Sequence, residues 1–509
     1  MQTNSTAQKE NEPSASPFNV VILGGGSAGW MTAAALANTL PSNHFNICLV
    51  ESEQIGTVSV GEATIPGIHD FNRFLEINEQ ELIKATNATF KLGIEFEGWT
   101  KGGKYLHPFG PYGLNKNGVP FHQMWLKAKL AGEDVAELVK YNMEGMAAQQ
   151  NKFSPKLNIP NFPIDHLNYA FHLDAVAYAK YLRQYAEQRG VERIEGKFEQ
   201  ARLNSDGFIQ SLVLDDGREI SGDFFIDCSG FKALLIEKTL HARYEDWRHW
   251  LPCDSAVAIQ SKSQRQINSY TKAITHEHGW RWQIPLQNRM GNGLVYSSRF
   301  MSKEQAVEKL QSLVNEELIT EPNHLHWVNG CRPEPWRKNC LAIGLSAGFI
   351  EPLESTGLQL IQSAIFRLLS LFPDKNFNQS NIDAYNRFAN DEIKSIRDFV
   401  ILHYKLTDND QSPFWDYCRN MDVPDSLQNK MAMYQQNGNL FRENNELFSE
   451  LNWLSVLNGQ GMLPKTTHPL TTQFSTREII SELQQIENAY SRIVDSLPSH
   501  DEFLAMLAQ

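Results

Sequence analysis

The chain has 509 residues, of which 41% are hydrophobic, and this predicts a globular protein of two or three lobes rather than a single core. Its 46 basic and 59 acidic residues give a formal net charge of -13, which opposes binding to nucleic acid or to an anionic membrane. The six cysteines show neither CxxC nor CxH spacing, so they support no zinc or other metal site and no disulfide framework. Reduced thiols in a cytoplasm fit this pattern.

Residues 1–17 are polar, rich in Ser, Asn, Glu and Pro, and lack the apolar core of a signal peptide. We expect them to form a disordered tail. No later apolar run reaches the length that a bilayer-spanning helix needs. The sequence therefore predicts a soluble, cytoplasmic protein without a membrane segment.

An apolar run at residues 20–23 predicts a buried strand that leads into Gly24-x-Gly26-x-x-Gly29 and then into an alanine-rich helix. In a dinucleotide-binding turn the first glycine permits the tight turn, the second lets the backbone approach the pyrophosphate, and the third allows close helix–strand packing. The dipole of the following helix faces the phosphates. A second apolar run ends in Glu51, where such a fold places its ribose-binding carboxylate. The pattern predicts a dinucleotide site but does not distinguish NAD from FAD, since both bind at such a turn.

Two further buried strands ending in glycine turns are predicted at residues 221–231 and 339–348. They lie too far along the chain for a simple βαβ repeat, so we expect an α/β fold in which insertions interrupt a Rossmann-type lobe of the FAD-binding kind. Alternating apolar residues at 209–214 and 280–284 predict antiparallel strands. After Thr356 apolar residues recur at helical spacing, which predicts a mainly helical C-terminal region.

These elements predict three consecutive segments of the chain. The disordered tail covers residues 1–17, and the nucleotide-binding lobe covers 18–360. Insertions at about 100–190 and 240–330 are expected to contribute to a second, substrate-binding lobe. The helical C-terminal region covers residues 361–509.

Several motifs together resemble the flavin-dependent tryptophan halogenases, and the resemblance runs from about residue 18 to the C-terminal helices. Trp280-x-Trp282-x-Ile284-Pro285 is the most specific motif, because ordinary flavin monooxygenases lack it. The other motifs that carry the resemblance lie at residues 24–30, 60–66, 90–91, 348–357, 397–399 and 403–405.

The resemblance implies an enzyme that uses reduced FAD, oxygen and chloride or bromide to make hypohalous acid, which then reaches a small aromatic substrate held elsewhere. Since the sequence has one dinucleotide fingerprint, a separate NAD(P)H-dependent flavin reductase is expected to supply the reduced FAD. A homodimer is compatible with the family. The implied contacts to FAD come from Gly24, Gly26, Ser27, Ala28, Gly29, Glu51, Ala63 and Ser355.

Lys91 is the residue that the resemblance matches to the essential lysine of the family, which hydrogen-bonds hypohalous acid or forms a haloamine. Judged from the residues alone, the alternation in 90–96 places Lys91, Glu95 and Glu97 on the polar face of a strand. A lysine on such a face is usually only solvated. A relay needs the compact ammonium or amine of lysine, because arginine does not form a haloamine in the same way.

Glu354 precedes a predicted helix, and Thr356 and Gln359 have the spacing of a capping box. The backbone N–H groups of Thr356 and Gly357 at that helix N-terminus suit a halide ion. The resemblance implies that the halide binds there and that Glu354 polarises the electrophile or accepts the ring proton. Ser355 is expected to couple the two sites through its backbone.

Trp280, Trp282 and Ile284 share one face of a strand, which is typical of core packing. In the family the two tryptophans line the region between flavin and substrate and disfavour ordinary monooxygenation, and Ile284 and Pro285 are further markers of the motif. We therefore expect exclusion, rather than proton transfer, from this motif.

His107 and Phe109 match the residues that sandwich the aromatic substrate in the family; the alternative is an ordinary turn with one buried ring. Enzymes acting on free tryptophan carry a tyrosine pair and a glutamate, where this chain has Trp453-Leu454 and Gln460. Without those partners the ammonium and carboxylate of tryptophan bind poorly. The sequence therefore predicts indole, a substituted indole or an indole within a larger molecule, with Trp453 able to stack on it.

Three other functions remain open from the residues. A flavin-dependent aromatic hydroxylase has the same fold, but Lys91 and the Trp-x-Trp-x-Ile-Pro motif argue against it. A non-catalytic flavin-binding protein is expected to have lost Lys91 or Glu354. A reductase with a tightly bound nicotinamide is disfavoured by the single glycine fingerprint.

Overall fold

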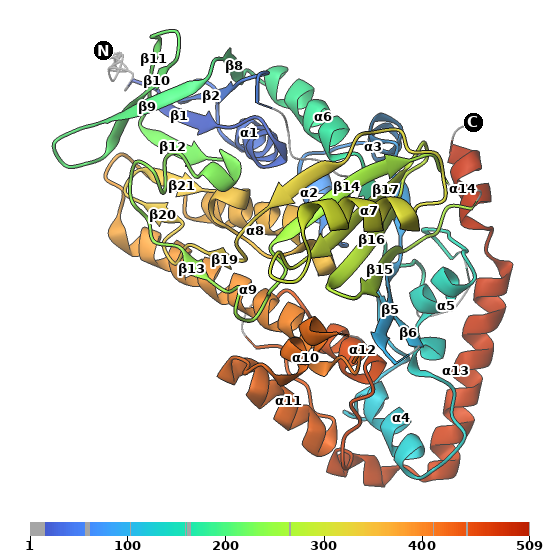
Figure 1. Ribbon diagram of the computed structural model, residues 1–509. Coiled ribbons are helices and arrows are strands. Elements are labelled where there is room, and N and C mark those ends of the chain that lie inside the picture. The colour runs from blue at the N-terminus through green and yellow to red at the C-terminus, as the bar shows by residue number, and fades with distance from the viewer. Residues whose placement is uncertain are drawn as a thin grey trace, which may run out of the picture.

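The computed structural model describes residues 16–55, 62–101, 103–157, 159, 164–263, 266–410, 412–443 and 446–507. Most of the predicted tail and the first two residues of the 60–66 motif lie outside these ranges. The predicted mixed α/β class is confirmed, since helices and sheets alternate along the first two thirds of the chain (Figure 1).

A six-stranded sheet contains all four strands that the sequence predicts as buried runs. Its order is β20-β21-β12-β1-β2-β8, and every neighbouring pair is parallel except β20 with β21. Strands far apart in the sequence thus lie side by side, as the blue, green and yellow strands in Figure 1 show. Their bounds are β1 Phe18–Leu23, β2 Phe45–Glu51, β8 Glu192–Glu195, β12 Phe224–Asp227, β20 Trp336–Arg337 and β21 Cys340–Ala342.

Helix α1 (Ser27–Thr39) follows β1 directly and packs against α6 (Ala175–Glu187) and α8 (Gly357–Ser370). Its alanine-rich face is buried, with Ala33, Ala34 and Ala35 inaccessible to solvent. Small side chains let the helices approach closely, which holds the N-terminus of α1 at the end of the parallel sheet.

A seven-stranded sheet joins the two predicted insertions, because its order is β18-β14-β17-β16-β15-β5-β6. Neighbours are antiparallel except β15 with β5. The prediction of an antiparallel strand at 280–284 is confirmed, since β16 runs between β15 and β17. The bounds are β5 Gly93–Thr100, β6 Gly103–Pro108, β14 Ser255–Ser261, β15 Thr271–His276, β16 Gly279–Pro285, β17 Met290–Tyr296 and β18 Asn323–His326.

Three small antiparallel sheets complete the strands of the described residues. The prediction at 209–214 is confirmed, because β10 (Ile209–Leu214) pairs with β9 (Phe198–Leu203) and β11 (Glu219–Ser221). A second sheet pairs β3 (Glu62–Ala63) and β4 (Thr89–Lys91) with β7 (Ala170–Leu173). The third consists of β13 Glu245–Asp246, β19 Gly330–Cys331 and β22 Gly348–Phe349.

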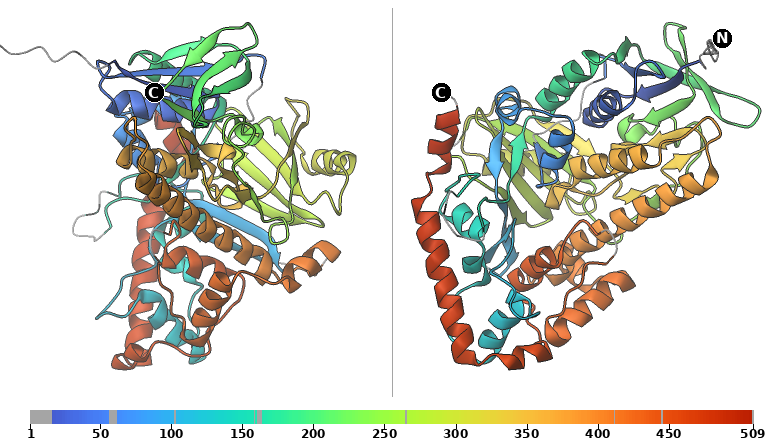
Figure 2. Two further views of the ribbon diagram at one scale, coloured as in Figure 1. Left: turned by 90° about the vertical axis from the view of Figure 1, so that its left-hand side faces the viewer. Right: turned by 180° about the vertical axis from the view of Figure 1, so that it is seen from behind.

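The named elements after Gly357 are all helical. The long helix α9 (Gln379–Leu406) contacts α8 and β20 near one end and α10, α11 and α12 near the other. Helix α13 (Thr476–Ser496) runs along one edge of the molecule, against α4 and α5 (Figure 2). The remaining bounds are α10 Pro413–Asn420, α11 Asp425–Asn437, α12 Glu450–Gly459, α14 His500–Leu507, α2 Ile68–Phe74, α3 Glu79–Thr86, α4 Phe121–Leu130, α5 Met143–Gln149 and α7 Lys303–Leu313.

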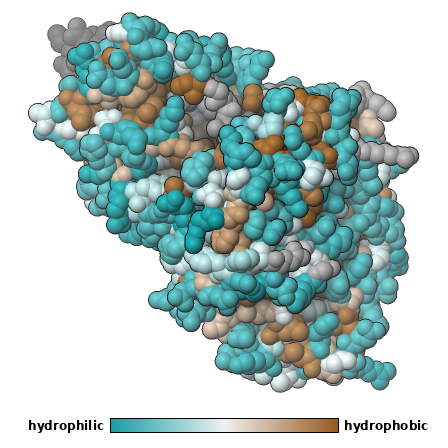
Figure 3. All heavy atoms as spheres, viewed as in Figure 1, coloured by the Kyte–Doolittle hydropathy of each residue, from teal (hydrophilic) through white to brown (hydrophobic). Residues whose placement is uncertain are grey.

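The surface seen in Figure 3 carries mostly hydrophilic side chains, with apolar ones in several small groups. Within the described part of the chain, the helices are too short or too polar to cross a bilayer.

Candidate active site

A cavity of about 590 Å³ opens at the carboxyl ends of β1, β2 and β12. One end is lined by the glycine turn and Glu51, and the other by residues of β16 and of the segment before α8. The lining residues include Gly24, Gly26, Ser27, Ala28, Glu51, Ala63, Trp280, Trp282, Ile284, Ser355 and Gly357. Nearly all of the predicted flavin contacts therefore surround one space.

The glycine turn has the geometry that a pyrophosphate needs. Gly24 has φ +117°, and a Cβ there would lie 2.3 Å from the carbonyl oxygen of Cys228. A Cβ on Gly29 would lie 1.8 Å from the carbonyl oxygen of Gly24, which keeps α1 close to β1. Gly26 caps α1 without a side-chain hydrogen bond, and nothing lies within 4 Å of its Cβ position. The N-terminus of α1 is thus open to an anion.

Glu51 ends β2 and faces the cavity, as expected of a ribose-binding carboxylate. Arg193 of β8 donates to one of its oxygens over 2.5 Å, and Trp30 Nε1 lies 3.4 Å from the other. The arginine fixes the carboxylate and partly offsets its charge. Sequence reasoning did not identify Arg193, because it lies 142 residues after Glu51 in the chain.

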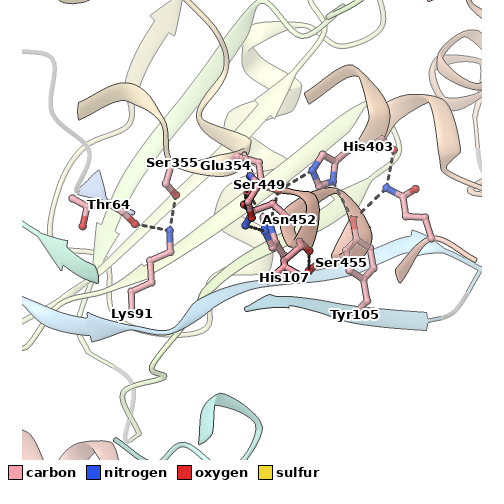
Figure 4. Close-up of polar contacts among 12 residues, drawn as sticks. Thr64, Lys91, Tyr105, His107, Glu354, Ser355, His403, Ser449, Asn452 and Ser455 are labelled. Atoms are coloured by element: carbon pink, nitrogen blue, oxygen red, sulfur yellow. Dashed lines mark hydrogen bonds and ion pairs between the residues drawn. The ribbon is translucent and has the colours of Figure 1, made fainter. Parts of the chain in front are cut away.

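Lys91 is fully buried at the end of β4. Its Nζ donates to the Thr64 carbonyl oxygen over 3.0 Å and to Ser355 Oγ over 2.8 Å (Figure 4). The alternative of a lysine that is only solvated is wrong, because the pairing of β4 with β7 covers this segment and residues 88–96 are all buried. Burial lowers the pKa of Lys91 to about 7, although Glu354 acts in the opposite direction.

Replacing Lys91 with methionine is expected to change how stability depends on pH. Between pH 7 and about pH 10 the unfolded wild type carries a proton on Lys91 that the folded protein has released, so its free energy of unfolding rises by about 1.4 kcal/mol per pH unit through this group. Lys91→Met lacks this contribution. Its free energy of unfolding is therefore expected to fall relative to that of wild type as the pH rises from 7 to 9. Urea unfolding at pH 7, 8 and 9 measures the difference; parallel pH dependences would contradict it.

Glu354 ends a short 3₁₀ helix (Pro352–Glu354) and is 2% exposed. His107 Nδ1 lies 3.0 and 3.1 Å from its two carboxylate oxygens, and His403 Nε2 lies 2.8 Å from Oε1. Burial by itself would raise the pKa of Glu354, but the positive charge that His107 and His403 carry when protonated, together with their N–H contacts, lowers it to about 2. The buried carboxylate is therefore ionised at neutral pH.

The turn between Glu354 and α8 differs from the sequence prediction in two ways. The capping box is wrong, because Thr356 adopts a helical conformation and makes no side-chain capping hydrogen bond. Ser355, with φ +59°, contacts Lys91 through its hydroxyl as well as taking part in the backbone turn. A Cβ on Gly357 would meet nothing within 4 Å. The start of α8 thus offers uncapped N–H groups beside the cavity, which suits the predicted halide site.

Trp280 and Trp282 both line the cavity and belong to a buried apolar cluster, so each side chain packs in the core and also forms part of the cavity wall. Trp280 Nε1 donates to Glu351 over 3.2 Å, and Tyr404 donates to the same carboxyl oxygen over 3.0 Å. Burial raises the pKa of Glu351 to about 7. Glu351 thereby anchors Trp280.

The predicted substrate residues lie in a buried aromatic cluster. The ring of Phe109 lies 5.5 Å from Lys91 Nζ. Trp453 of α12 contacts Phe399 at 5.0 Å, and Phe399 in turn contacts His107 at 5.8 Å between ring centroids. The ring nitrogens of His107 contact Glu354 and Asn452, so hydrogen bonds in the plane of the ring hold this side chain in place.

Sequence reasoning missed several members of this site, among them Tyr105, Phe399, His403, Phe448 and Asn452. Phe399 and His403 are four residues apart on α9 and share one helix face. That spacing, within motifs already noted at 397–399 and 403–405, was a usable signal. No sequence pattern pointed to Asn452 or Tyr105, because they come to the site through the packing of α12 against β6.

Comparisons with known proteins agree with this geometry. The family model described as tryptophan halogenase matches residues 19–476. The 7-chloro-L-tryptophan 6-halogenase KtzR of Kutzneria sp. (strain 744) is 34% identical over 96% of this chain and 99% of its own.

Two solved structures are similar over nearly their whole length. Xcc4156, a flavin-dependent halogenase from Xanthomonas campestris, is 44% identical with a TM-score of 0.92, covering 96% of this chain and 98% of its own. BrvH, a flavin-dependent halogenase from Brevundimonas sp. BAL3, is 41% identical with a TM-score of 0.91, covering 96% and 99%. The predicted resemblance is confirmed: this chain belongs to the tryptophan halogenase family and is a flavin-dependent halogenase.

Proposed function

We propose that this enzyme uses reduced FAD, oxygen and chloride or bromide to halogenate an uncharged, indole-type aromatic molecule. One observation carries the proposal. Ser355 lines the cavity and accepts a hydrogen bond from the buried Lys91, and the adjacent residue, Glu354, is a buried carboxylate. Lys91 thus contacts a residue that lines a nucleotide-sized cavity, and the preceding residue of the chain is a buried carboxylate outside the lining of that cavity.

The cavity suits FAD on the grounds of its residues. The open N-terminus of α1 accepts a pyrophosphate, Glu51 accepts ribose hydroxyls, and the apolar walls of Trp280, Trp282 and Ile284 suit a flat ring. When bound, reduced FAD supplies, with oxygen, the oxidising power that turns a halide ion into hypohalous acid. We assign this role to the lobe built on the six-stranded sheet, within residues 18–360, and substrate binding to the insertions and the helices of 361–509.

Lys91 is proposed to carry the electrophile from the cavity to the substrate. A neutral amine forms a nitrogen–halogen bond with hypohalous acid and releases water; an ammonium instead donates a hydrogen bond to the departing hydroxide. Because burial brings the pKa of Lys91 to about 7, both forms are populated near neutral pH. Thr64 and Ser355 hold the nitrogen in place in either form.

Glu354 is proposed to accept the ring proton. Electrophilic substitution places the halogen on a ring carbon, and that carbon then gives up its proton to restore aromaticity. An ionised, buried carboxylate stabilises the cationic ring and takes this proton. The start of α8, at Thr356 and Gly357, is the proposed halide site.

The substrate is proposed to be indole-like and to lack a charged backbone. The cluster of His107, Phe109 and Phe399 offers ring surfaces, while Gln460 already donates to Tyr105 and to the His403 carbonyl oxygen. Reduced flavin is proposed to come from a separate NAD(P)H-dependent reductase.

Competition between indole and free tryptophan tests the substrate class. We expect indole to be halogenated faster under identical flavin supply, because burying an ammonium and a carboxylate without partners costs several kcal/mol, whereas ring stacking contributes about 1 kcal/mol. Product ratios by mass spectrometry, with equal concentrations of both, give the answer. A clear preference for tryptophan would mean that other residues of the C-terminal helices bind its charged groups.

A further inference from the structure

We propose that two amide side chains, Asn452 and Gln460, fix the proton positions on His107 and His403, so that both rings are neutral and each directs one N–H at the Glu354 carboxylate. His403 is then a positioning residue for Glu354. The inference rests on the proposed role of Glu354, and it extends that role to residues outside the reacting centre. Figure 4 shows His107 of β6, His403 of α9 and Asn452 of α12 on the side of Glu354 away from Lys91.

The proton on His107 follows from the cap of helix α12. The backbone N–H of Ser449 only donates, and it donates to Asn452 Oδ1 over 2.8 Å. The amide nitrogen of Asn452 must then face His107 Nε2, at 2.9 Å. Because an amide nitrogen only donates, Nε2 of His107 carries a lone pair. The ring proton is therefore on Nδ1, the atom 3.0 Å from Glu354 Oε2.

The proton on His403 follows from a second chain of contacts. The backbone carbonyl oxygen of His403 only accepts, and Gln460 Nε2 lies 3.1 Å from it, which fixes the amide orientation. The same nitrogen donates to Tyr105 OH over 3.2 Å. Tyr105 OH still has one proton to donate, and His403 Nδ1, 3.0 Å away, is its other hydrogen-bond partner among the described residues, so we assign the proton to this contact. His403 keeps its own proton on Nε2, which lies 2.8 Å from Glu354 Oε1, at ion-pair distance; this nitrogen makes no hydrogen bond of regular geometry among the described residues.

Glu354 thus lies between two neutral N–H donors. The titratable groups that face it are His107 and Tyr105 from β6, His403 from α9 and Lys91 from β4. A doubly protonated His107 would bring its Nε2–H against the Asn452 amide hydrogens. With both rings neutral, contacts with N–H groups and not an imidazolium hold the negative charge of Glu354. Its pKa is then lowered less than it would be beside a protonated ring, so the carboxylate is a better proton acceptor.

Nitrogen NMR of protein labelled with ¹⁵N-histidine tests the proton positions directly, without any substrate or flavin. The protonated and unprotonated nitrogens of a neutral imidazole resonate far apart, and long-range correlations to the ring hydrogens tell Nδ1 from Nε2. His107→Gln and His403→Gln assign the two rings. We expect Nδ1–H for His107 and Nε2–H for His403 at pH 7. An imidazolium, or the opposite tautomer, at either ring would overturn the inference.

Two amide variants test whether Asn452 and Gln460 set these tautomers. Asn452→Leu and Gln460→Met keep the approximate size and remove the donor. Each is expected to turn its own histidine into a mixture of tautomers while the other histidine is unchanged. Unchanged tautomers in both folded variants would overturn the inference.

The positioning role is tested by a pair of substitutions at His403. His403→Leu removes the N–H donor and is expected to lower kcat for halogenation about 10- to 100-fold with little change in the KM for indole, as expected for the loss of a hydrogen bond to a charged group. His403→Gln keeps a donor at the same distance and restores most of kcat. His122→Leu removes a buried histidine that bonds to the Gly438 carbonyl oxygen, and serves as the control for general destabilisation. Equal losses of kcat in His403→Leu and His403→Gln would overturn the positioning role. If the wild type makes no halogenated product, the proposed function is contradicted, but the NMR test of the tautomers can still be read.

Discussion

Lys91→Ala is expected to abolish halogenated product while the protein still binds FAD and still oxidises reduced FAD. The relay is proposed to act after hypohalous acid has formed, so removing it separates the two halves of the reaction. Because Lys91 is fully buried, Lys91→Met is the better-packed version of the same test. Flavin oxidation is followed by absorbance, and product by mass spectrometry in the same sample.

Lys127→Met is the control for this pair. Lys127 also donates to two backbone carbonyl oxygens, those of Thr471 and Phe474, and does not line the cavity. The control is expected to form product as the wild type does. Halogenation by Lys91→Met at a rate near that of wild type contradicts the relay, and a loss of FAD binding would instead indicate that Lys91 supports the cavity wall through Ser355.

Glu354→Gln is expected to reduce the halogenation rate by about 10²- to 10⁴-fold, the range typical of general acid–base groups. The amide has the shape of the carboxylate but no charge, so it neither stabilises the cationic ring nor takes its proton. Single-turnover rates at saturating indole measure this loss.

Glu144→Gln is the matched control for that experiment. Glu144 is also a buried glutamate, its pKa is raised to about 7 by burial, and it accepts hydrogen bonds from Asn168. Its replacement is expected to leave the halogenation rate within a few fold of wild type. If Glu354→Gln behaves like this control, Glu354 has only a structural role.

The parts of the fold that local sequence patterns determine were predictable. The run before Gly24 predicted β1, alternation predicted β16, and helical spacing after Thr356 predicted α8. Each of these patterns lies within a few residues, so chain geometry alone produces it.

The parts that depend on distant contacts were not predictable. Alternation around Lys91 indicated a solvated face, but β7, about 80 residues later, buries β4. The capping box at Thr356 failed because the tight turn at Ser355 gives the helix start another backbone geometry. The partners of Glu354, His107 and His403, are 247 and 49 residues away from it in opposite directions along the chain. Such constellations arise only when the sheets and helices pack.

The most direct test of a halogenating relay is the mass of the product made from indole with reduced FAD, a flavin reductase and either bromide, chloride or no halide. We predict a monohalogenated indole, recognised by the isotope pattern of bromine or chlorine, and no such product when halide is omitted. A hydroxylated indole formed equally well without halide would contradict the account.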